Sequence, residues 1–263
     1  MELGLEGRVA LICGGSSGLG RAIAGGLAAE GARIALNARR VERLEASAAE
    51  LGTLHHAEVV PFPADLADGD QAAALAARVV ERFGRLDILL CNAGGPAPAR
   101  FTETTPESWQ RALDLNLLST MHLCRAAIPH MRSGRFGRIL VIASVAAKQP
   151  LPGLILSTTA RAGVLGFSKA LSDELASDGI TANALCPGLF ATDRVEFLAR
   201  ERAARDGRSA DEVIREQAAG VPLGRLGQPE EFAAAAVFLA SERAGYITGV
   251  ALSVDGGMHR SIL

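Results

Sequence analysis

Three glycines, Gly14, Gly18 and Gly20, are the first residues of the chain whose spacing suits a specific chemistry. They lie within residues 9–31, where an apolar segment is followed by an amphipathic one, so we predict a strand, a tight turn and a helix that begins at Gly18 or Leu19. Glycine permits the turn at the first position, close approach to a pyrophosphate at the second, and packing of helix on strand at the third. Free N–H groups at the helix start can then bind phosphates. The pattern predicts a dinucleotide site; a tight turn without a ligand is the alternative.

The segment after the second predicted strand, Arg33–Ala38, bears on the choice of cofactor. About 20 residues beyond the glycines, a site for NAD places an acid that holds the ribose 2′-hydroxyl. Here Arg39 and Arg40 follow the strand instead. Because guanidinium groups bind phosphate, we predict NADP(H), with Arg39 on its 2′-phosphate; two solvated loop arginines are the alternative.

Strand and helix patterns alternate along the whole chain. Apolar strands separated by helices indicate an α/β fold, a doubly wound, Rossmann-like parallel sheet of about seven strands with helices on both faces. The other strands are predicted at 58–62, 86–91, 138–144, 180–186 and 251–255, and the longer helices begin near positions 41, 70, 106 and 156, the third of them running to 131. We predict a single NADP(H)-binding domain over residues 1–263, with a helical region at 194–220 that covers the substrate.

Ligands of such sheets bind beyond the carboxyl ends of the strands. Small or polar residues occur at four of these predicted ends: Gly14, Asn92-Ala93-Gly94, Ser144 and Pro187-Gly188. We therefore expect the site to lie along this edge.

Composition argues against several classes of partner. The 263 residues carry a formal net charge of −2, which gives no electrostatic reason to expect nucleic acid or an anionic membrane. No apolar run approaches the ~20 residues of a membrane span, and the first residues lack the features of a signal peptide, so we predict a cytoplasmic protein. The four cysteines show no CxxC spacing and are predicted to be reduced core thiols, with no metal site.

Ordered motifs along essentially the whole chain resemble those of the short-chain dehydrogenase/reductase family. They are CGGSSGLG (13–20) for the family's TGxxxGxG, DL (65–66), NAG (92–94), Asn116 in LDLNLLS, Ser144 in VIASVAA, PGLFAT (187–192) and YITGVALSVDGG (246–257). The resemblance implies an oxidoreductase for a small carbonyl or hydroxyl substrate, of the 3-oxoacyl type or related, that forms a homo-oligomer, a tetramer or dimer. It implies cofactor contacts at Gly14, Ser16, Ser17, Gly18, Leu19, Gly20, Asp65, Leu66, Asn92, Ala93, Gly94, Pro187, Gly188 and Thr192.

The chain departs from the family at its YxxxK motif, which stands thirteen residues after the catalytic serine. Counting from Ser144 leads to Ser157, and Arg161 occupies the lysine position. The one tyrosine, Tyr246, belongs to another motif. A serine hydroxyl is a weaker and shorter acid than a phenol, and loss of a positioned acid typically costs ~10²–10⁴ in rate. Arg161 stays cationic and cannot relay protons, but its planar fork can bind cofactor ribose hydroxyls or an anion.

Three hypotheses are open at this point. In the favoured one, Ser144, Ser157 and Arg161 form the catalytic site with Asn116: the serine and the guanidinium polarise a substrate oxygen, and a water held by Asn116 supplies the proton. An anionic substrate would suit Arg161. In the second hypothesis Lys148 supplies the acid, against the alternative of a solvated loop lysine. In the third, the protein binds NADP(H) without turnover, as a sensor or an oligomer subunit.

Overall fold

Seven parallel strands form one sheet in the computed structural model, which describes residues 2–261. The strand order is β3-β2-β1-β4-β5-β6-β7, so the chain winds first to one side of β1 and then to the other. The strands are β1 (Val9–Ile12), β2 (Arg33–Ala38), β3 (Val59–Pro63), β4 (Ile88–Cys91), β5 (Gly137–Ile142), β6 (Ile180–Pro187) and β7 (Ala251–Val254). The central strands β1, β4 and β5 are buried along their whole length. This confirms the predicted doubly wound parallel sheet.

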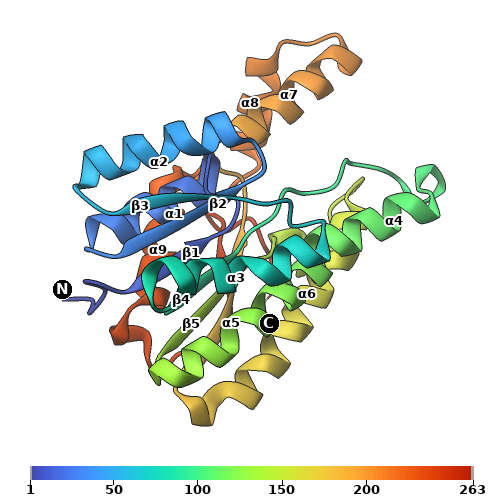
Figure 1. The fold of residues 1–263 in the computed structure, drawn as a ribbon. Coiled ribbons are helices and arrows are strands. Elements are labelled where there is room, and N and C mark those ends of the chain that lie inside the picture. The colour runs from blue at the N-terminus through green and yellow to red at the C-terminus, as the bar shows by residue number, and fades with distance from the viewer. Residues whose placement is uncertain (1, 262–263) are drawn as a thin grey trace.

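Helices cover both faces of the sheet (Figure 1). They are α1 (Gly18–Ala29), α2 (Val41–His55), α3 (Gly69–Phe83), α4 (Pro106–Leu113), α5 (Ser119–Gly134), α6 (Ile155–Leu175), α7 (Asp193–Asp206), α8 (Ala210–Ala219) and α9 (Pro229–Ala240). The helices α1, α2 and α9 pack on one face, and α3, α5 and α6 on the other. Within residues 2–261, none of the helices combines the length and apolar character needed to cross a bilayer.

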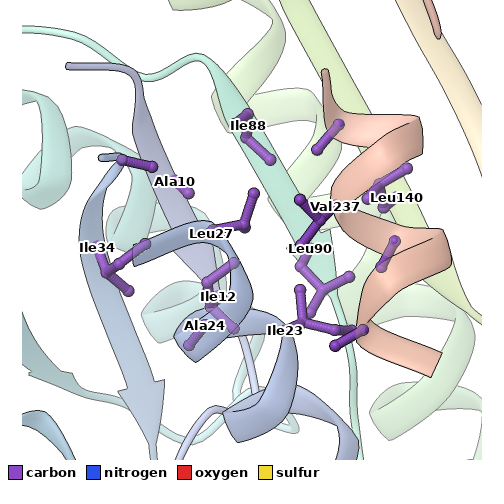
Figure 2. Close-up of a cluster of buried hydrophobic side chains, with 14 of the residues drawn as sticks. Ala10, Ile12, Ile23, Ala24, Leu27, Ile34, Ile88, Leu90, Leu140 and Val237 are labelled. Atoms are coloured by element: carbon purple, nitrogen blue, oxygen red, sulfur yellow. The ribbon is translucent and has the colours of Figure 1, made fainter. Parts of the chain in front are cut away.

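One of the two large apolar clusters fixes the position of α1 on the sheet (Figure 2). Ile23 and Leu27 on α1 are fully buried in the same cluster as Ile12 of β1 and Leu90 of β4. Val237 of α9, the helix beside α1, belongs to the same cluster. Truncating a buried leucine or isoleucine to alanine typically costs ~2–5 kcal/mol, so this cluster holds the first turn of α1 firmly at the carboxyl end of β1.

The helix predicted from position 106 to 131 is interrupted. A π-helical turn, Asp114–Leu118, separates α4 from α5. Around it, side chains bond to backbone carbonyls one turn back: the Asn116 amide donates to Ala112 O, and the Ser119 and Thr120 hydroxyls donate to the carbonyls four residues before them. Side chains that bond the backbone in this way commonly accompany local distortion of a helix. The apolar periodicity that predicted one helix does not register such a turn.

Helices α7 and α8 form a hairpin that projects from the body of the molecule (Figure 1). Ala199 and Ala203 of α7 and Val213 of α8 make its own small apolar cluster. Glu216 of α8 receives ion pairs from two arginines, at 2.7 and 2.5 Å, one of which, Arg202, lies on α7. This hairpin corresponds to the helical region predicted at 194–220.

All four cysteines are buried and free, as predicted. Burial raises the pKa of the Cys13 thiol well above its ordinary value. The thiol of Cys91 likewise has a raised pKa, through its hydrogen bond to Cys124 and through burial. Buried, protonated thiols are poor nucleophiles, so these cysteines act as core side chains.

Candidate active site

A cavity of about 770 Å³ opens at the carboxyl ends of β1, β2, β4, β5 and β6. Its walls include almost all of the site residues predicted from the sequence. Those that line it are Gly14, Ser16, Ser17, Gly18, Leu19, Arg39, Asp65, Leu66, Asn92, Ala93, Gly94, Ser144, Ser157, Arg161, Pro187, Gly188 and Thr192. Two predicted residues, Gly20 and Asn116, are not among them.

The glycine turn has the backbone geometry that its sequence predicts. Gly14 and Gly18 adopt φ angles of +61° and +52°, a region that favours glycine. A Cβ on Gly20 would lie 2.3 Å from the carbonyl oxygen of Gly14, so only glycine lets α1 pack this closely on the end of β1. Asn92 at the end of β4 reaches the same carbonyl oxygen with its Nδ2, at 3.4 Å. Gly20 therefore contributes to the site by allowing this close packing, although it does not line the cavity.

The start of α1 is suited to an anionic ligand. Its N-cap residue, Ser17, makes no side-chain capping bond, and its first turn contains no acidic residue. The N–H groups of that turn are thus available to phosphate oxygens. Nearby, the Oδ1 atom of Asn37 is buried without a hydrogen-bond partner, while its Nδ2 donates to Phe62 O at 2.9 Å. Asn37 is among the residues that line the cavity. These features fit a dinucleotide.

Arg39 and Arg40 border the cavity after β2. The Arg39 side chain is 69% exposed, and its Nη1 lies 4.0 Å from Asp65 Oδ2, at the limit of an ion pair. An exposed ion pair at this distance contributes little stability. Arg39 is therefore available to bind a phosphate group.

Ser144 and Ser157 approach the cavity from two different elements. Ser144 follows β5 and caps a short 3₁₀ turn, Val145–Ala147, in which its Oγ accepts a hydrogen bond from Ala146 N at 3.1 Å. Its hydroxyl proton remains available to a substrate oxygen. Ser157 lies in the first turn of α6, which directs it to the same cavity.

Arg161 lies one turn further along α6. Its guanidinium donates to the carbonyl oxygen of Ala143, at the end of β5, and to that of Ala93, after β4, at 3.4 Å. Its Nε is buried and has no hydrogen-bond partner. Burial is the largest cause that lowers the pKa of Arg161, to about 10. The group therefore stays cationic at neutral pH and can polarise a neighbouring oxygen.

The first turn of α7 bridges the two rims of the cavity. On one rim, Asp193 forms an ion pair of 2.5 Å with Arg43, whose Nε also donates to Ser16 O in the glycine turn, at 3.3 Å. On the other rim, Arg194 Nη2 donates to Pro96 O at 3.3 Å. We call this pair of contacts, Asp193–Arg43 and Arg194–Pro96, the α7 bridge.

Comparison with known proteins agrees with this geometry. A family model described as enoyl-(acyl carrier protein) reductase matches residues 14–259. The chain belongs to the short-chain dehydrogenase/reductase family. It is 37% identical over 257 residues to the 3-oxoacyl-[acyl-carrier-protein] reductase FabG of Haemophilus influenzae, covering 98% of this chain and 100% of that protein. It is 38% identical over 253 residues to acetoacetyl-CoA reductase of Rhizobium meliloti, covering 96% and 98%.

Solved structures give the same result. The L-sorbose reductase of Gluconobacter frateurii, in complex with NADPH and L-sorbose, matches with a TM-score of 0.96 and 37% identity over all of both chains. YwfH, an NADPH-dependent reductase involved in bacilysin biosynthesis, matches with a TM-score of 0.92 and 32% identity over 97% of this chain and 99% of that one. The short-chain dehydrogenase/reductase fold and a nicotinamide cofactor are thereby supported, and these relatives are reductases.

Asn116, which the sequence assigned to catalysis, and Lys148, considered there as an alternative acid, are not among the residues that line the cavity of this short-chain dehydrogenase/reductase. Asn116 is buried in the π-helical turn, where its amide is bonded to Ala112 O and its own carbonyl oxygen accepts from the Thr120 hydroxyl. Lys148 turns to β7, where its Nζ donates to Ser253 Oγ at 3.1 Å, and it does not line the cavity. Both side chains are already engaged by the protein.

Sequence reasoning missed several cavity residues of this family member. They are Asn37, Leu115, Leu151, Leu154, Val195, Leu198 and Met258, and Arg194 was placed only within the covering region. Most are apolar residues in loops or near the starts of helices, and an apolar residue type alone does not indicate a role in binding or catalysis. Arg194 is the exception, since a basic residue two positions after a predicted strand-end motif, PGLFAT, could have been singled out. Within residues 2–261, no three His, Cys, Asp or Glu side chains are grouped to hold a metal ion.

Proposed function

We propose that this protein reduces a small carbonyl compound with NADPH, and that Arg161 polarises the carbonyl oxygen by its charge at a site that lacks the family's tyrosine. One observation carries the proposal: Ser144, Ser157 and Arg161 line the same cavity as a glycine turn with phosphate-binding geometry. The names of the similar reductases, and the NADPH bound in the L-sorbose reductase, support it.

The residues assigned to the cofactor would bind different parts of it, according to their positions along the cavity. N–H groups at the start of α1 would hold the pyrophosphate, and Arg39 and Arg40 the 2′-phosphate. Segments 92–94 and 187–192 border the remaining length of the cavity. When bound there, NADPH supplies a hydride to the carbonyl carbon. We also infer that residues 1–263 act as one domain in which the α7–α8 hairpin covers the substrate.

The chain's own contribution is electrostatic. As the carbonyl carbon gains a C–H bond, the π electrons of the C=O bond move to oxygen, and a negative charge develops there. The Ser144 hydroxyl can donate to this oxygen, and the cation of Arg161, with its free Nε–H, can stabilise the charge. A water molecule gives the proton that completes the hydroxyl product, because no tyrosine is among the described residues that line the cavity. Removing one such donor typically costs ~10²–10³ in kcat.

A second function, a cofactor-binding module without turnover, is favoured by one observation. The guanidinium of Arg161 is bonded to two backbone carbonyls, those of Ala143 and Ala93. In that arrangement it acts as a structural clamp between β4 and β5. Ser157 would then complete a site that binds the nucleotide alone.

The experiment that separates these functions measures binding and turnover in parallel. Purified protein is titrated with NADPH by nicotinamide fluorescence, and NADPH oxidation is followed in absorbance with a panel of ketones, oxo acids and 3-oxoacyl thioesters. We expect tight binding and oxidation with at least one substrate, and an ~10²-fold or greater loss of kcat in Arg161→Ala with NADPH affinity retained. Binding without oxidation across the panel would contradict the reductase and support the module.

A restored motif provides a further control. Ser157→Tyr combined with Arg161→Lys rebuilds the family's YxxxK spacing on α6. If the site has kept its geometry, the double variant should reduce ketones that the native protein reduces slowly. Its NADPH affinity, measured in the same titration, reports whether the site is intact.

A further inference from the structure

Arg161 and Arg194 share one end of the cavity without a carboxylate partner. The acidic residues that line the cavity in the described chain are Asp65 and Asp193. Asp65 lies beside Arg39, and Asp193 pairs with Arg43 at 2.5 Å. Both acids thus belong to the side of the glycine turn and β2, and neither neutralises the other two arginines.

The two arginines converge on the loop that follows β4. Arg161 donates to Ala93 O at 3.4 Å, and Arg194 donates to Pro96 O at 3.3 Å, three residues further along. The positive charge of Arg194 acts with burial to lower the pKa of Arg161, so the two cations repel one another across the cavity. Their bonds to backbone carbonyls use only part of their donors, and Arg161 Nε has no partner.

Arg138 shows what a satisfied buried arginine looks like in the same sheet. At the amino end of β5, its Nε donates to Ser241 O at 3.0 Å and its Nη1 to Gly137 O at 2.9 Å. Burial and the nearby cation of Arg8 lower the pKa of Arg138, and the carboxylate of Glu242 acts against them. Arg161 has neither an Nε partner nor a nearby acid, and it faces a cavity. Two guanidinium groups without a carboxylate partner at a cavity are suited to bind a carboxylate. A planar guanidinium can bind a carboxylate through two parallel hydrogen bonds.

The walls around this pair are apolar. Leu115 from the π-helical turn, Leu151 and Leu154 before α6, Leu198 of α7 and Met258 from the carboxyl-terminal segment all line the cavity. A ligand that fits this end therefore has an apolar body and a single anionic group.

We propose that the substrate is an oxo acid with an apolar tail, whose carboxylate is bound by Arg194 while its carbonyl oxygen lies against Arg161 and Ser144. This rests on the proposed carbonyl reduction and adds its substrate class. Arg194 is then the residue that determines specificity, because it supplies a guanidinium without a carboxylate partner at the same end of the cavity as Arg161. The substrates in the names of the L-sorbose reductase and of the thioester reductases carry uncharged groups beside the carbonyl. The substrate class proposed here therefore differs from theirs.

The test compares an acid with its ester, which has the same carbonyl but no charge. The pairs are 2-oxohexanoate with its methyl ester and 4-oxopentanoate with its methyl ester. We expect kcat/KM for an acid to exceed that of its ester by about 10–100-fold, as a charged hydrogen-bonded pair contributes ~1.5–3 kcal/mol. In Arg194→Met this ratio should fall toward one. Arg200→Met, on the same helix but outside the cavity lining, should retain the native ratio.

A binding measurement keeps this result separate from the proposed reduction. Calorimetric titration of the NADP⁺-saturated protein with each acid and ester requires no turnover. Acid binding that is lost in Arg194→Met supports the carboxylate site even if no substrate is reduced, in which case only the reductase proposal fails. Two results overturn the inference: esters that match or exceed acids in the native protein, or an Arg194→Met variant that loses NADPH affinity while keeping the acid-to-ester ratio, which would assign Arg194 to the cofactor phosphates.

Discussion

Arg161 stands where the motifs of the family place a lysine, and the change alters what the position can do. A lysine is a point charge on a flexible stem and can lose its proton when buried, whereas the guanidinium is planar and far more basic. Here burial lowers the pKa of Arg161 only to about 10. The position can therefore hold charge and orient hydrogen bonds at neutral pH, but it cannot pass a proton onward.

This has a measurable consequence for the pH dependence of turnover. A cation with a folded-state pKa of about 10 is present below that pH and lost above it. We expect kcat on an uncharged ketone to be flat between about pH 6 and pH 9 and to fall as the pH rises through about 10. A profile governed instead by a group that titrates near neutrality would show that another residue supplies the proton.

Arg39 governs the choice between NADPH and NADH in the proposed site. Its side chain is 69% exposed and only weakly paired, at 4.0 Å from Asp65. We expect Arg39→Ala to raise the Kd for NADPH by about 10–100-fold, because the variant loses a charged hydrogen bond to the phosphate. The Kd for NADH should stay within about twofold of its native value. Fluorescence titration with both nucleotides measures this. Equal affinity of the native protein for the two would refute the assignment.

At the scale of elements, the contact between α1 and β1 determines the shape of the nucleotide site. Gly20→Ala would place a Cβ 2.3 Å from Gly14 O, a backbone atom that cannot move aside cheaply. We expect a loss of about 1–3 kcal/mol in the free energy of unfolding, as for overpacked cores, and at least tenfold weaker NADPH binding.

Gly166→Ala provides the matched control. This glycine lies within α6, and a Cβ there would meet nothing within 4 Å. Removing a helical glycine should raise the free energy of unfolding by about 0.5–1 kcal/mol. Urea denaturation measures the free energy of unfolding of both variants. Similar effects of the two substitutions would contradict the steric argument.

Comparing the predicted helices and strands with the observed ones shows which parts of the structure can be predicted from the sequence. The strand predicted at Arg33–Ala38 has the observed bounds, because apolar runs between turn residues carry the signal of a buried strand. The glycine turn was also predictable, since few residues adopt its backbone angles. The π-helical turn at 114–118 was not, because it depends on hydrogen bonds made after the helix has formed. Asn116 was expected in the catalytic site because it stands in a motif that resembles the family's, and it does not line the cavity.

In the candidate site, the residues found from sequence are those whose type is unusual for their position. Glycines at the turn and arginines after β2 belong to this group. The leucines that wall the substrate end, such as Leu151 and Leu198, resemble any core residue and are recognised only once the fold brings them together. The approach of Arg194 to Arg161 is likewise visible only in three dimensions, since the two arginines come from separate helices, α7 and α6.

At the scale of the whole molecule, the sheet ends in an edge that is poorly covered. Among residues 2–261, strand β7 pairs with β6 alone, and its own Leu252 is exposed, as are Phe238 of α9 and Tyr246. An exposed edge strand with apolar neighbours favours pairing with another chain. We therefore propose this edge as the contact of the expected homo-oligomer.

A charge placed on this edge should weaken the assembly. Leu252 is 40% exposed, and Leu252→Glu would bring like charges together across a contact between identical chains. We expect sedimentation velocity to show a shift to a smaller species. Leu54→Glu is the control, because Leu54 is 65% exposed on α2, away from β7. An unchanged sedimentation coefficient for Leu252→Glu would contradict the assignment.

The α7 bridge makes the exchange of ligands sensitive to the surrounding solution. Its ion pair between Asp193 and Arg43 is largely exposed, and such pairs contribute only ~0–1 kcal/mol and weaken as salt screens them. We expect a ligand bound beneath the bridge to leave when these contacts open. Added salt should therefore shorten the residence time of NADP⁺, and where product departure limits the cycle, moderate ionic strength would speed turnover while leaving the chemical step unchanged.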